Sequence, residues 1–274
     1  MRPMPIPAPA PERTAVVTGA SSGIGRELAR QLAGRGHGLT LVARREARLR
    51  ALADELTGAH GVRIEVVPAD LTEVAARDAV AAAVDERGLV VHVLVNAAGL
   101  GTSGAVHRSD PAAEVGMLRA DVEAVAHLTT LFLPGMVERG VGAVLNVAST
   151  AAFQPLPGQA AYSAAKAFVL TYSQAVRAEL RGTGVSVTVV CPGPVDTEFA
   201  ERAGFDSAEA ESGLPRFMWV DVETVARAAL DGLDRGRAVV VPGVANHLGA
   251  LGARFAPRSL LLPLLARQHP ALRR

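Results

Sequence analysis

Tyr162 and Lys166 are the residues with the clearest chemical potential, and they stand four positions apart in the segment YSAAK. Lys166 is the only lysine among the 28 basic side chains, which indicates a place where an arginine cannot substitute for it. Residues four apart share one face of a helix, so the phenol and the ammonium would face the same point. A nearby cation lowers the pKa of a phenol and thereby fits it for proton transfer near neutral pH. The same spacing is typical of a half-exposed tyrosine with a lysine lying along it, and the pair alone leaves both interpretations open.

Ser149 could add a hydroxyl to this pair. It ends a predicted strand and lies 13 residues before Tyr162. A serine in that position is also an ordinary turn former, so its chemical role depends on where the fold places it.

The chain offers no other nucleophile or metal site. Cys191 is the only cysteine, which excludes an intramolecular disulfide and fits a reducing compartment. No histidine is placed to activate its thiol, so we expect a buried apolar role. The seven histidines lack HxxxH spacing and companion cysteines, and we therefore predict no metal site.

Apolar β-branched runs alternate along the chain with amphipathic stretches. This rhythm predicts βαβ units with right-handed crossovers, and hence one doubly wound, Rossmann-type α/β domain with a mainly parallel seven-stranded sheet. Hydrophobic residues make up 49% of the chain but aromatic ones only 4%, as expected for buried parallel strands covered by helices. The predicted strands are 15–18, 39–43, 62–67, 91–95, 143–148, 185–190 and 238–241, and the clearest predicted helices are 24–34, 46–56, 73–87 and 224–233.

Composition also divides the chain into three parts. Residues 1–13 alternate proline with small residues, which predicts a disordered or polyproline tail and not a signal peptide. Residues 14–243 would form the dinucleotide-binding catalytic domain. Residues 244–274 would form a helical extension, apolar with spaced arginines, that packs across a subunit interface, over the substrate cleft or on a membrane surface. We favour packing on the domain or on a partner subunit.

Bulk charge excludes some partners. The net charge of +1 and the pI near 8.1 give no reason to expect nucleic-acid binding. No run of about 18 apolar residues occurs, so we predict no transmembrane helix and a cytoplasmic location.

A glycine-rich turn follows the first predicted strand and opens the first predicted helix. Glycines there permit a tight turn and let the backbone approach a pyrophosphate, which the start of the helix attracts. A lone glycine-rich turn is weak evidence, but its position after the first strand of an α/β chain predicts dinucleotide binding. The predicted contacts are Gly19, Ser21, Ser22, Gly23, Ile24 and Gly25.

Arg44 and Arg45 stand at the end of the second predicted strand. NAD-binding folds often carry an acidic residue at this point for the ribose 2′-hydroxyl, whereas arginine suits a 2′-phosphate. The pair therefore predicts NADP(H) as the cofactor. The alternative is two solvent-exposed arginines in a chain that uses arginine freely.

Other predicted cofactor contacts follow the third, fourth and sixth strands. The carboxyl ends of parallel strands are where a dinucleotide lies in an open α/β sheet. Taken singly, each of these residues could be an ordinary helix cap or turn former. They are Asp70, Leu71, Asn96, Ala97, Gly99, Pro192, Gly193, Val195 and Thr197.

Together these segments resemble the short-chain dehydrogenase/reductase family. The resemblance covers residues 14–241 and includes TGxxxGIG, NAAG, YxxxK, Asp70 and the PG turn before Thr197, in the family's order and spacing. It implies that Ser149 polarises the substrate carbonyl and that Tyr162 transfers the proton. It also implies that Lys166 binds the nicotinamide ribose and tunes Tyr162. The phrases LVARR and VPG look similar to those of a bacterial NADPH-linked subgroup of poorly defined substrates.

The chain departs from the family pattern at two points. The usual NNAG motif reads NAAG, and Asp121 occupies the position of the family's catalytic asparagine. The resemblance implies that the backbone carbonyl there holds a water of a proton relay, which any side chain permits. An ionised Asp121 near Lys166 would favour the ammonium and raise the pKa of Tyr162. A protonated carboxyl, or a surface position one turn away, would have no such effect.

The sequence thus predicts an NADP(H)-dependent carbonyl reductase or alcohol dehydrogenase. The resemblance to the family also implies a homodimer or homotetramer. Its predicted partner is a small apolar carbonyl or alcohol compound. The second hypothesis is a catalytically silent NADP(H)-binding sensor or scaffold, against which the intact Ser149, Tyr162 and Lys166 set argues. An epimerase or dehydratase ranks last, because its larger substrate domain does not fit in 274 residues.

The substrate pocket is predicted to be apolar and medium to large. The loop 198–219 is irregular and holds several of the few aromatics, which suggests a lid or, equally, an anchor of the loop to the core. The predicted walls are Leu100, Phe153, Leu156, Val195, Phe205, Phe217 and Trp219.

Overall fold

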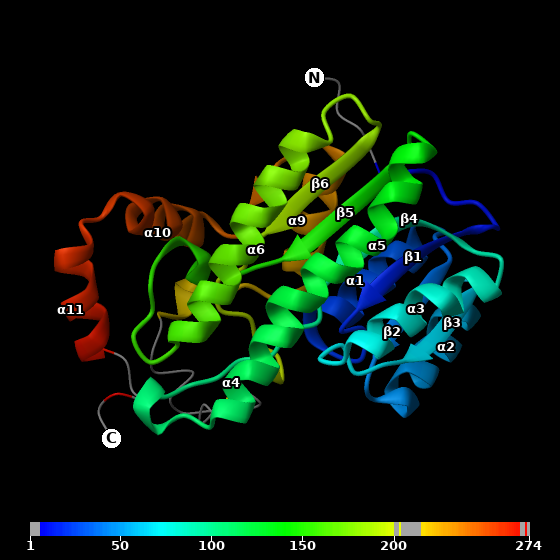
Figure 1. Cartoon of the computed structure of the whole chain (residues 1–274). Coiled ribbons are helices and arrows are strands. Elements are labelled where there is room, and N and C mark those ends of the chain that lie inside the picture. Colours follow the sequence, from blue (N-terminus) through cyan, green and yellow to red (C-terminus); the bar gives the residue numbers. More distant parts are fainter. Residues whose placement is uncertain (1–5, 200–202, 204–214, 269–271, 273–274) are drawn as a thin grey trace.

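Seven parallel strands run through the centre of the protein in the order β3-β2-β1-β4-β5-β6-β7 (Figure 1). The computed structural model describes residues 6–199, 203, 215–268 and 272. Every strand pair in the described part is parallel, so the prediction of a single doubly wound, seven-stranded sheet is confirmed. The strands are β1 Arg13–Thr18, β2 Leu39–Ala43, β3 Ile64–Pro68, β4 Val90–Asn96, β5 Gly142–Val147, β6 Val185–Val190 and β7 Val239–Val240.

Helices cover both faces of this sheet. α1 (Gly23–Gly34), α2 (Glu46–His60) and α9 (Val222–Asp234) bury their leucines against one face. α3 (Val74–Glu86), α5 (Ala124–Glu138) and α6 (Ala160–Glu179) cover the other. Alternate side chains of a strand point to opposite faces, so one continuous apolar strand contributes side chains to the hydrophobic cores on both faces of the sheet. The remaining elements are the short helices η1 Val106–Arg108, η3 Thr150–Phe153 and η4 Arg216–Met218, the helix α4 Pro111–Leu118, the π-helical turn η2 Arg119–Glu123, and the C-terminal helices α10 Val244–Phe255 and α11 Arg258–Gln268.

The strand order reverses between β1 and β4. β1 continues outward to β2 and β3, whereas β4 continues the other way to β5, β6 and β7. The loops after β1 and β4 therefore diverge and leave a crevice at the carboxyl edge of the sheet, which is where ligands bind in open α/β folds. The glycine-rich turn, the predicted strand-end contacts and Ser149 all lie at this edge.

The N-terminal residues differ from the predicted tail. Arg13 is already the first residue of β1, and Ile6 packs beside the core of the first face. The amide of Ile6 donates a hydrogen bond to the Asp234 carboxylate at 3.0 Å. Residues 6–12 therefore lie against the domain. The Ile6 side chain packs on its apolar surface, and the Ile6 amide has a hydrogen-bond acceptor there. Residues 1–5 of the predicted tail lie outside the described residues.

The C-terminal extension forms two helices at the side of the molecule farthest from β3 (Figure 1). α10 packs against η3 and η4, next to the carboxyl edge of the sheet. Among the residues that the structure describes, no helix has the length and apolarity needed to cross a bilayer.

Candidate active site

Tyr162 and Lys166 lie one turn apart near the start of α6, and both are buried. Their side chains face the same point, since the Lys166 ammonium nitrogen is 5.6 Å from the centroid of the phenol ring. Lys166 is 5% exposed and donates a long hydrogen bond of 3.4 Å to the carbonyl of Val147 at the end of β5. A half-exposed tyrosine with a lysine lying along it would be far more accessible to solvent, so that interpretation of the pair is wrong.

Ser149 stands two residues after β5, opposite the start of α6. Its hydroxyl accepts a hydrogen bond from the Ala151 amide at 3.1 Å, which fixes the side chain at the beginning of η3. The same hydroxyl lies near enough to the Tyr162 side chain to lower the pKa of its phenol. The turn therefore orients the Ser149 hydroxyl toward the phenol, as its predicted role requires.

Asp121 reaches this cluster from the π-helical turn η2, between α4 and α5. Its carboxylate is fully buried and lies 2.8 Å from the Lys166 ammonium. Its other oxygen accepts a hydrogen bond of 2.7 Å from the Leu100 amide. A π-helical turn carries one more residue than an α-helical turn, and such turns are frequent at functional sites. The surface position considered for Asp121 is excluded by this burial.

Burial and charge shift the proton affinities of the cluster in opposing ways. Burial raises the pKa of Asp121, although Lys166 pulls it back. Burial lowers the pKa of Lys166, but the attraction of Asp121 and of a Tyr162 phenolate outweighs it and leaves this pKa raised. Burial raises the pKa of Tyr162, and Asp121 raises it further, while Lys166 and the Ser149 hydroxyl lower it. Lys166 and Ser149 are therefore the groups that favour the phenolate, and Asp121 opposes them.

This balance gives a prediction for Asp121→Asn. The amide removes the negative charge that raises the Tyr162 pKa but keeps an oxygen for the Leu100 amide. If the Tyr162 phenolate is the base of alcohol oxidation, the acidic limb of the pH profile of kcat/KM should move to lower pH. The matched control is Glu123→Gln, which removes a carboxylate from the same turn, and an equal shift in both variants would exclude a specific coupling of Asp121 to Tyr162.

The glycine-rich turn between β1 and α1 has the shape that a dinucleotide requires. Gly19 has a φ of +68°, and a Cβ there would lie 2.7 Å from the Ala97 carbonyl oxygen. A Cβ on Gly25 would lie 2.6 Å from the Gly19 carbonyl oxygen. The first glycine thus allows the turn to pass the end of β4, and the second allows α1 to begin directly beneath it. The turn leaves the start of α1 facing the crevice, where a pyrophosphate fits.

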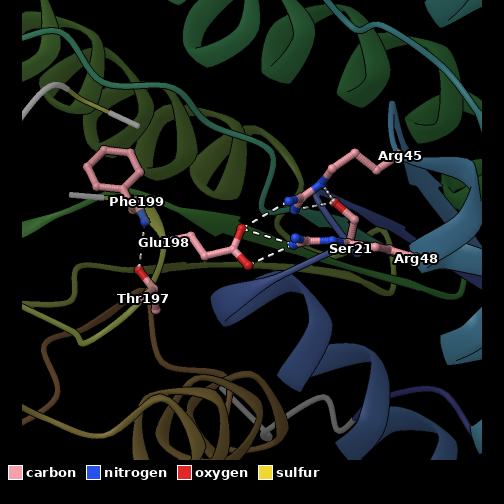
Figure 2. A network of polar contacts seen from close by, with 6 residues as sticks. All are labelled: Ser21, Arg45, Arg48, Thr197, Glu198 and Phe199. Atoms are coloured by element: carbon pink, nitrogen blue, oxygen red, sulfur yellow. Dashed lines mark hydrogen bonds and ion pairs between the residues drawn. The ribbon is translucent and has the colours of Figure 1, made fainter. Parts of the chain in front are cut away.

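Arg45 belongs to a polar network that crosses the crevice (Figure 2). Its guanidinium donates to the Ser21 hydroxyl at 2.9 and 3.2 Å and to the Glu198 carboxylate at 2.9 Å. Arg48 also donates to Glu198, at 2.7 Å. Glu198 follows β6, so its carboxylate links that loop to the start of α2. Arg44 lies apart from this network, 57% exposed and 3.8 Å from the Asp70 carboxylate.

A cavity of about 770 Å³ connects all these elements. Nearly all predicted cofactor contacts line it, from the glycine-rich turn and the arginines to the residues after β3 and β6. Asn96 is the exception. Its side chain points into the sheet and donates to Asn146 at 2.9 Å and Thr129 at 3.2 Å. The lining members of the predicted set are Gly19, Ser21, Ser22, Gly23, Ile24, Gly25, Arg44, Arg45, Asp70, Leu71, Ala97, Gly99, Ser149, Tyr162, Lys166, Pro192, Gly193, Val195 and Thr197.

The apolar wall of the cavity differs in part from the prediction. Leu100, Leu156, Val195 and Trp219 line it as expected. Phe153 is instead turned toward the core behind η3, and Phe217 is 75% exposed on η4. The sequence of a short irregular segment does not show which aromatic side chains turn toward a cavity. The prediction that Phe153 and Phe217 form part of the wall is therefore wrong. Phe205 lies outside the described residues.

Several residues of the cavity wall were not predicted from the sequence. Phe199 lies 5.5 Å from the Tyr162 ring between centroids, although it stands in the loop whose aromatics were considered. Met218 lines the same wall. The inner face of α10 and one leucine of α11 complete it, namely Asn246, Gly249, Ala250, Ala253 and Leu265. The spacing of Asn246, Ala250 and Ala253 at helical intervals was the available signal.

Cys191 lies outside this chemistry, as predicted. It is fully buried, and burial raises the pKa of its thiol to about 12, so the thiolate is not accessible near neutral pH. In the described part of the chain no group of His, Cys, Asp or Glu could hold a metal ion.

Comparison with known proteins assigns the chain and its fold to a family. Residues 13–207, well over half of the chain, match the profile described as short chain dehydrogenase. The chain belongs to this family. The resemblance drawn from the motifs is therefore confirmed, and the protein is an NAD(P)-dependent oxidoreductase of the short-chain dehydrogenase family, acting on the CH–OH/C=O pair.

Three similar proteins show how wide the range of relatives is. Sulfoacetaldehyde reductase 2 of Chromohalobacter salexigens is 37% identical over 205 residues, which are 72% of this chain and 79% of that protein. A short-chain dehydrogenase from Sphingobium yanoikuyae, solved in complex with NADPH, is 36% identical with a TM-score of 0.79 over 92% of this chain and 95% of that chain. The bulky-bulky ketone specific alcohol dehydrogenase from Comamonas testosteroni is 31% identical with a TM-score of 0.75 over 96% of this chain and 99% of that chain.

Proposed function

We propose that this short-chain dehydrogenase uses NADP(H) to interconvert an apolar ketone or aldehyde and its alcohol, with Tyr162 as the proton donor and acceptor. The observation that carries the proposal is the cluster of Ser149, Tyr162 and Lys166 in the same cavity as the glycine-rich turn, with the buried Asp121 paired to Lys166. A silent binding protein has no need of a buried phenol between a hydroxyl and an ammonium.

Each member of the cluster has a distinct part in the proposed reaction. The Ser149 hydroxyl, fixed by the Ala151 amide, orients and polarises the carbonyl. Tyr162 gives a proton to the forming alkoxide during reduction and takes it back during oxidation. Lys166 favours the phenolate and binds the nicotinamide ribose, and Asp121 holds Lys166 in place. The nicotinamide cofactor supplies the hydride, and the protein supplies positioning and electrostatics.

The predicted cofactor contacts keep their proposed roles along the cavity. The turn from Gly19 to Gly25 would hold the pyrophosphate, and Arg44 with Arg45 would hold the 2′-phosphate. The Asn96 side chain would act indirectly, by fixing the end of β4. The residues from Pro192 to Thr197 would contact the nicotinamide end, beside the proposed substrate wall. The NADPH complex of the Sphingobium yanoikuyae relative supports this choice of cofactor.

An apolar substrate is supported by the apolar part of the cavity wall. Leu100, Leu156, Val195, Met218 and Trp219 line the same cavity as Tyr162, and Leu100 and Leu156 pack in one cluster with it. A wall of this kind buries alkyl or aromatic groups well and leaves a small anionic substrate without a partner. The specificity of the Comamonas testosteroni relative for bulky-bulky ketones agrees with this class.

The test is NADPH oxidation with ketones graded by size and charge. We expect turnover to increase from small keto acids to bulky apolar ketones. Faster turnover of small charged keto acids would overturn the substrate class. NADPH binding without oxidation by any carbonyl compound would favour the silent sensor.

Arg44→Asp tests the preference for NADP(H). Arg44 is exposed beside Asp70 and is free of the network around Glu198, so it can turn toward a 2′-phosphate. A charge-assisted contact contributes about 1.5–3 kcal/mol, so NADPH should bind roughly ten- to a hundredfold more weakly in the variant while NADH is little affected. Fluorescence titration measures both constants. Equal affinity of the unmodified protein for NADPH and NADH would contradict the assignment.

Glu198→Gln tests whether Arg45 takes part in the same contact. The Glu198 carboxylate accepts hydrogen bonds from Arg45 and Arg48 (Figure 2), so it would compete with a 2′-phosphate for both guanidinium groups, and its charge would repel the phosphate. Exposed ion pairs contribute up to about 1 kcal/mol, so NADPH should bind about two- to fivefold more tightly in the variant, with NADH unchanged. Weaker NADPH binding would mean that Glu198 orders the arginines for the phosphate and does not compete with it.

A further inference from the structure

The outward face of α10 is an apolar stripe that no described part of the chain covers. Val244, Leu248, Leu251 and Phe255 follow one another at intervals of four, three and four residues, which places them in one narrow line along the helix. The two ends of the line, Val244 and Phe255, are 81% and 73% exposed. On an ordinary surface helix this line would be polar.

The orientation of α10 is fixed by its other face. Asn246, Ala250 and Ala253 are buried there against η3, η4 and the cavity. The Asn246 amide donates to the carbonyls of Met218 at 2.9 Å and Pro242 at 3.1 Å. The helix therefore cannot rotate to hide its apolar line without breaking these contacts and opening the cavity.

α11 adds two apolar side chains. Leu260 and Leu264 stand one turn apart on it and are also exposed. Together with the four residues of α10 we call them the α10–α11 apolar stripe: Val244, Leu248, Leu251, Phe255, Leu260 and Leu264. Both helices stand at the edge of the molecule (Figure 1), and the exposure of all six side chains leaves them open to a large partner.

The charged side chains of the C-terminal segment all have one sign. Residues 244–274 contain five arginines and no aspartate or glutamate. The whole chain has 28 basic and 27 acidic side chains, so residues 1–243 carry a net charge of −4. Arg254 lies next to the stripe with its guanidinium 5.9 Å from the Phe255 ring, and Arg258 donates to the carbonyls of Ala253 and Phe153. Three of the arginines, Arg254, Arg258 and Arg267, thus stand on the two helices that expose the apolar side chains.

We propose that the α10–α11 apolar stripe docks onto an anionic lipid surface. An amphipathic helix with an apolar line and flanking arginines, and without acidic residues, fits the boundary between headgroups and acyl chains. The arginine stems lie along the apolar phase while the guanidinium groups reach the phosphates. A second copy is a poorer occupant, because symmetric pairing of the stripe would bring arginines against arginines.

Docking would bring the cavity close to the bilayer. α10 presents the stripe on one face and lines the cavity with the other, so a single helix would separate the site from the lipid. An apolar ketone dissolved in the membrane would then have a short path to Tyr162. Only this consequence rests on the proposed function, and the docking itself does not.

The test is co-flotation of the full chain with vesicles of phosphatidylcholine alone or with about a third phosphatidylglycerol. We expect binding to the anionic vesicles that weakens in about 0.5 M salt, since salt screens the arginines. Leu248→Glu with Phe255→Glu should weaken this binding about tenfold or more, because both side chains are exposed and leave the fold intact. The matched control is Val74→Glu with Val106→Glu, two exposed valines on other elements, which should bind like the unmodified protein.

Two results would overturn the proposal. One is the absence of binding to anionic vesicles by the intact, folded protein. The other is an oligomer that becomes smaller in the Leu248→Glu, Phe255→Glu variant while vesicles bind neither protein, which would identify a second copy as the occupant. Light scattering of the same samples distinguishes these results, and neither depends on which carbonyl compound the enzyme reduces.

Discussion

Tyr162→Phe should reduce kcat by about 10²- to 10⁴-fold, because the variant has no proton to give to the alkoxide and no base to take it back. The ring remains, so its contacts with Phe199 and the Lys166 ammonium should persist. NADPH affinity should therefore change little. Steady-state kinetics and fluorescence titration of the same preparation separate the two effects.

The chain contains its own control for this prediction. Tyr172 is the only other tyrosine and lies on the same helix, where it stacks on Phe168. Tyr172→Phe removes the same hydroxyl and should leave kcat within about twofold, as for most substitutions away from a site. Comparable losses in the two variants would mean that the phenol of Tyr162 acts through the stability of α6 and not in proton transfer.

Lys166→Arg should lower kcat about a hundredfold or more, although the charge is kept. The ammonium lies between Asp121, the Val147 carbonyl and Gly99, where a Cβ placed on the glycine would be only 3.3 Å from the nitrogen. A planar guanidinium is wider than this space and would displace its neighbours. Circular dichroism and the melting temperature check that the variant folds. A folded variant that keeps more than about a tenth of the activity would show that positive charge alone is sufficient.

The sequence predicted the sheet well because the signal for buried parallel strands is local. Each strand is a short β-branched run between amphipathic helices, and strands of this kind pair in few arrangements. The strand limits shifted by up to two residues, as for β3, which begins at Ile64. The start of the chain was harder, since the contact of Ile6 with Asp234 joins residues 228 positions apart.

The candidate site shows the same division between local and distant information. Tyr162 and Lys166 share one helix, so their spacing alone predicted that they face one point. The position of Asp121 was predicted only from the spacing of the family's motifs. Its burial against Lys166 depends on a π-helical turn, which no residue pattern predicts. The contact between Arg45 and Glu198 joins residues 153 positions apart and could not be read from either segment.

The sequence also predicted only in part that α10 has one face toward the cavity and one exposed apolar face. Its sequence shows an apolar helix with arginines, and packing on the domain, a second subunit or a membrane all remained open. The structure assigns the small residues Ala250 and Ala253 to the cavity side and leaves Leu248 and Phe255 exposed. A sequence pattern gives the two faces of a helix but not which of them turns toward the rest of the protein.

The most direct test of the central claim compares NADPH binding and NADPH oxidation in the unmodified protein and in Tyr162→Phe, with one bulky apolar ketone that the unmodified protein turns over. We expect similar NADPH affinity in both proteins and oxidation only in the unmodified one. Equal oxidation rates in the two proteins would contradict it, as would the failure of every carbonyl compound to be reduced by a protein that binds NADPH.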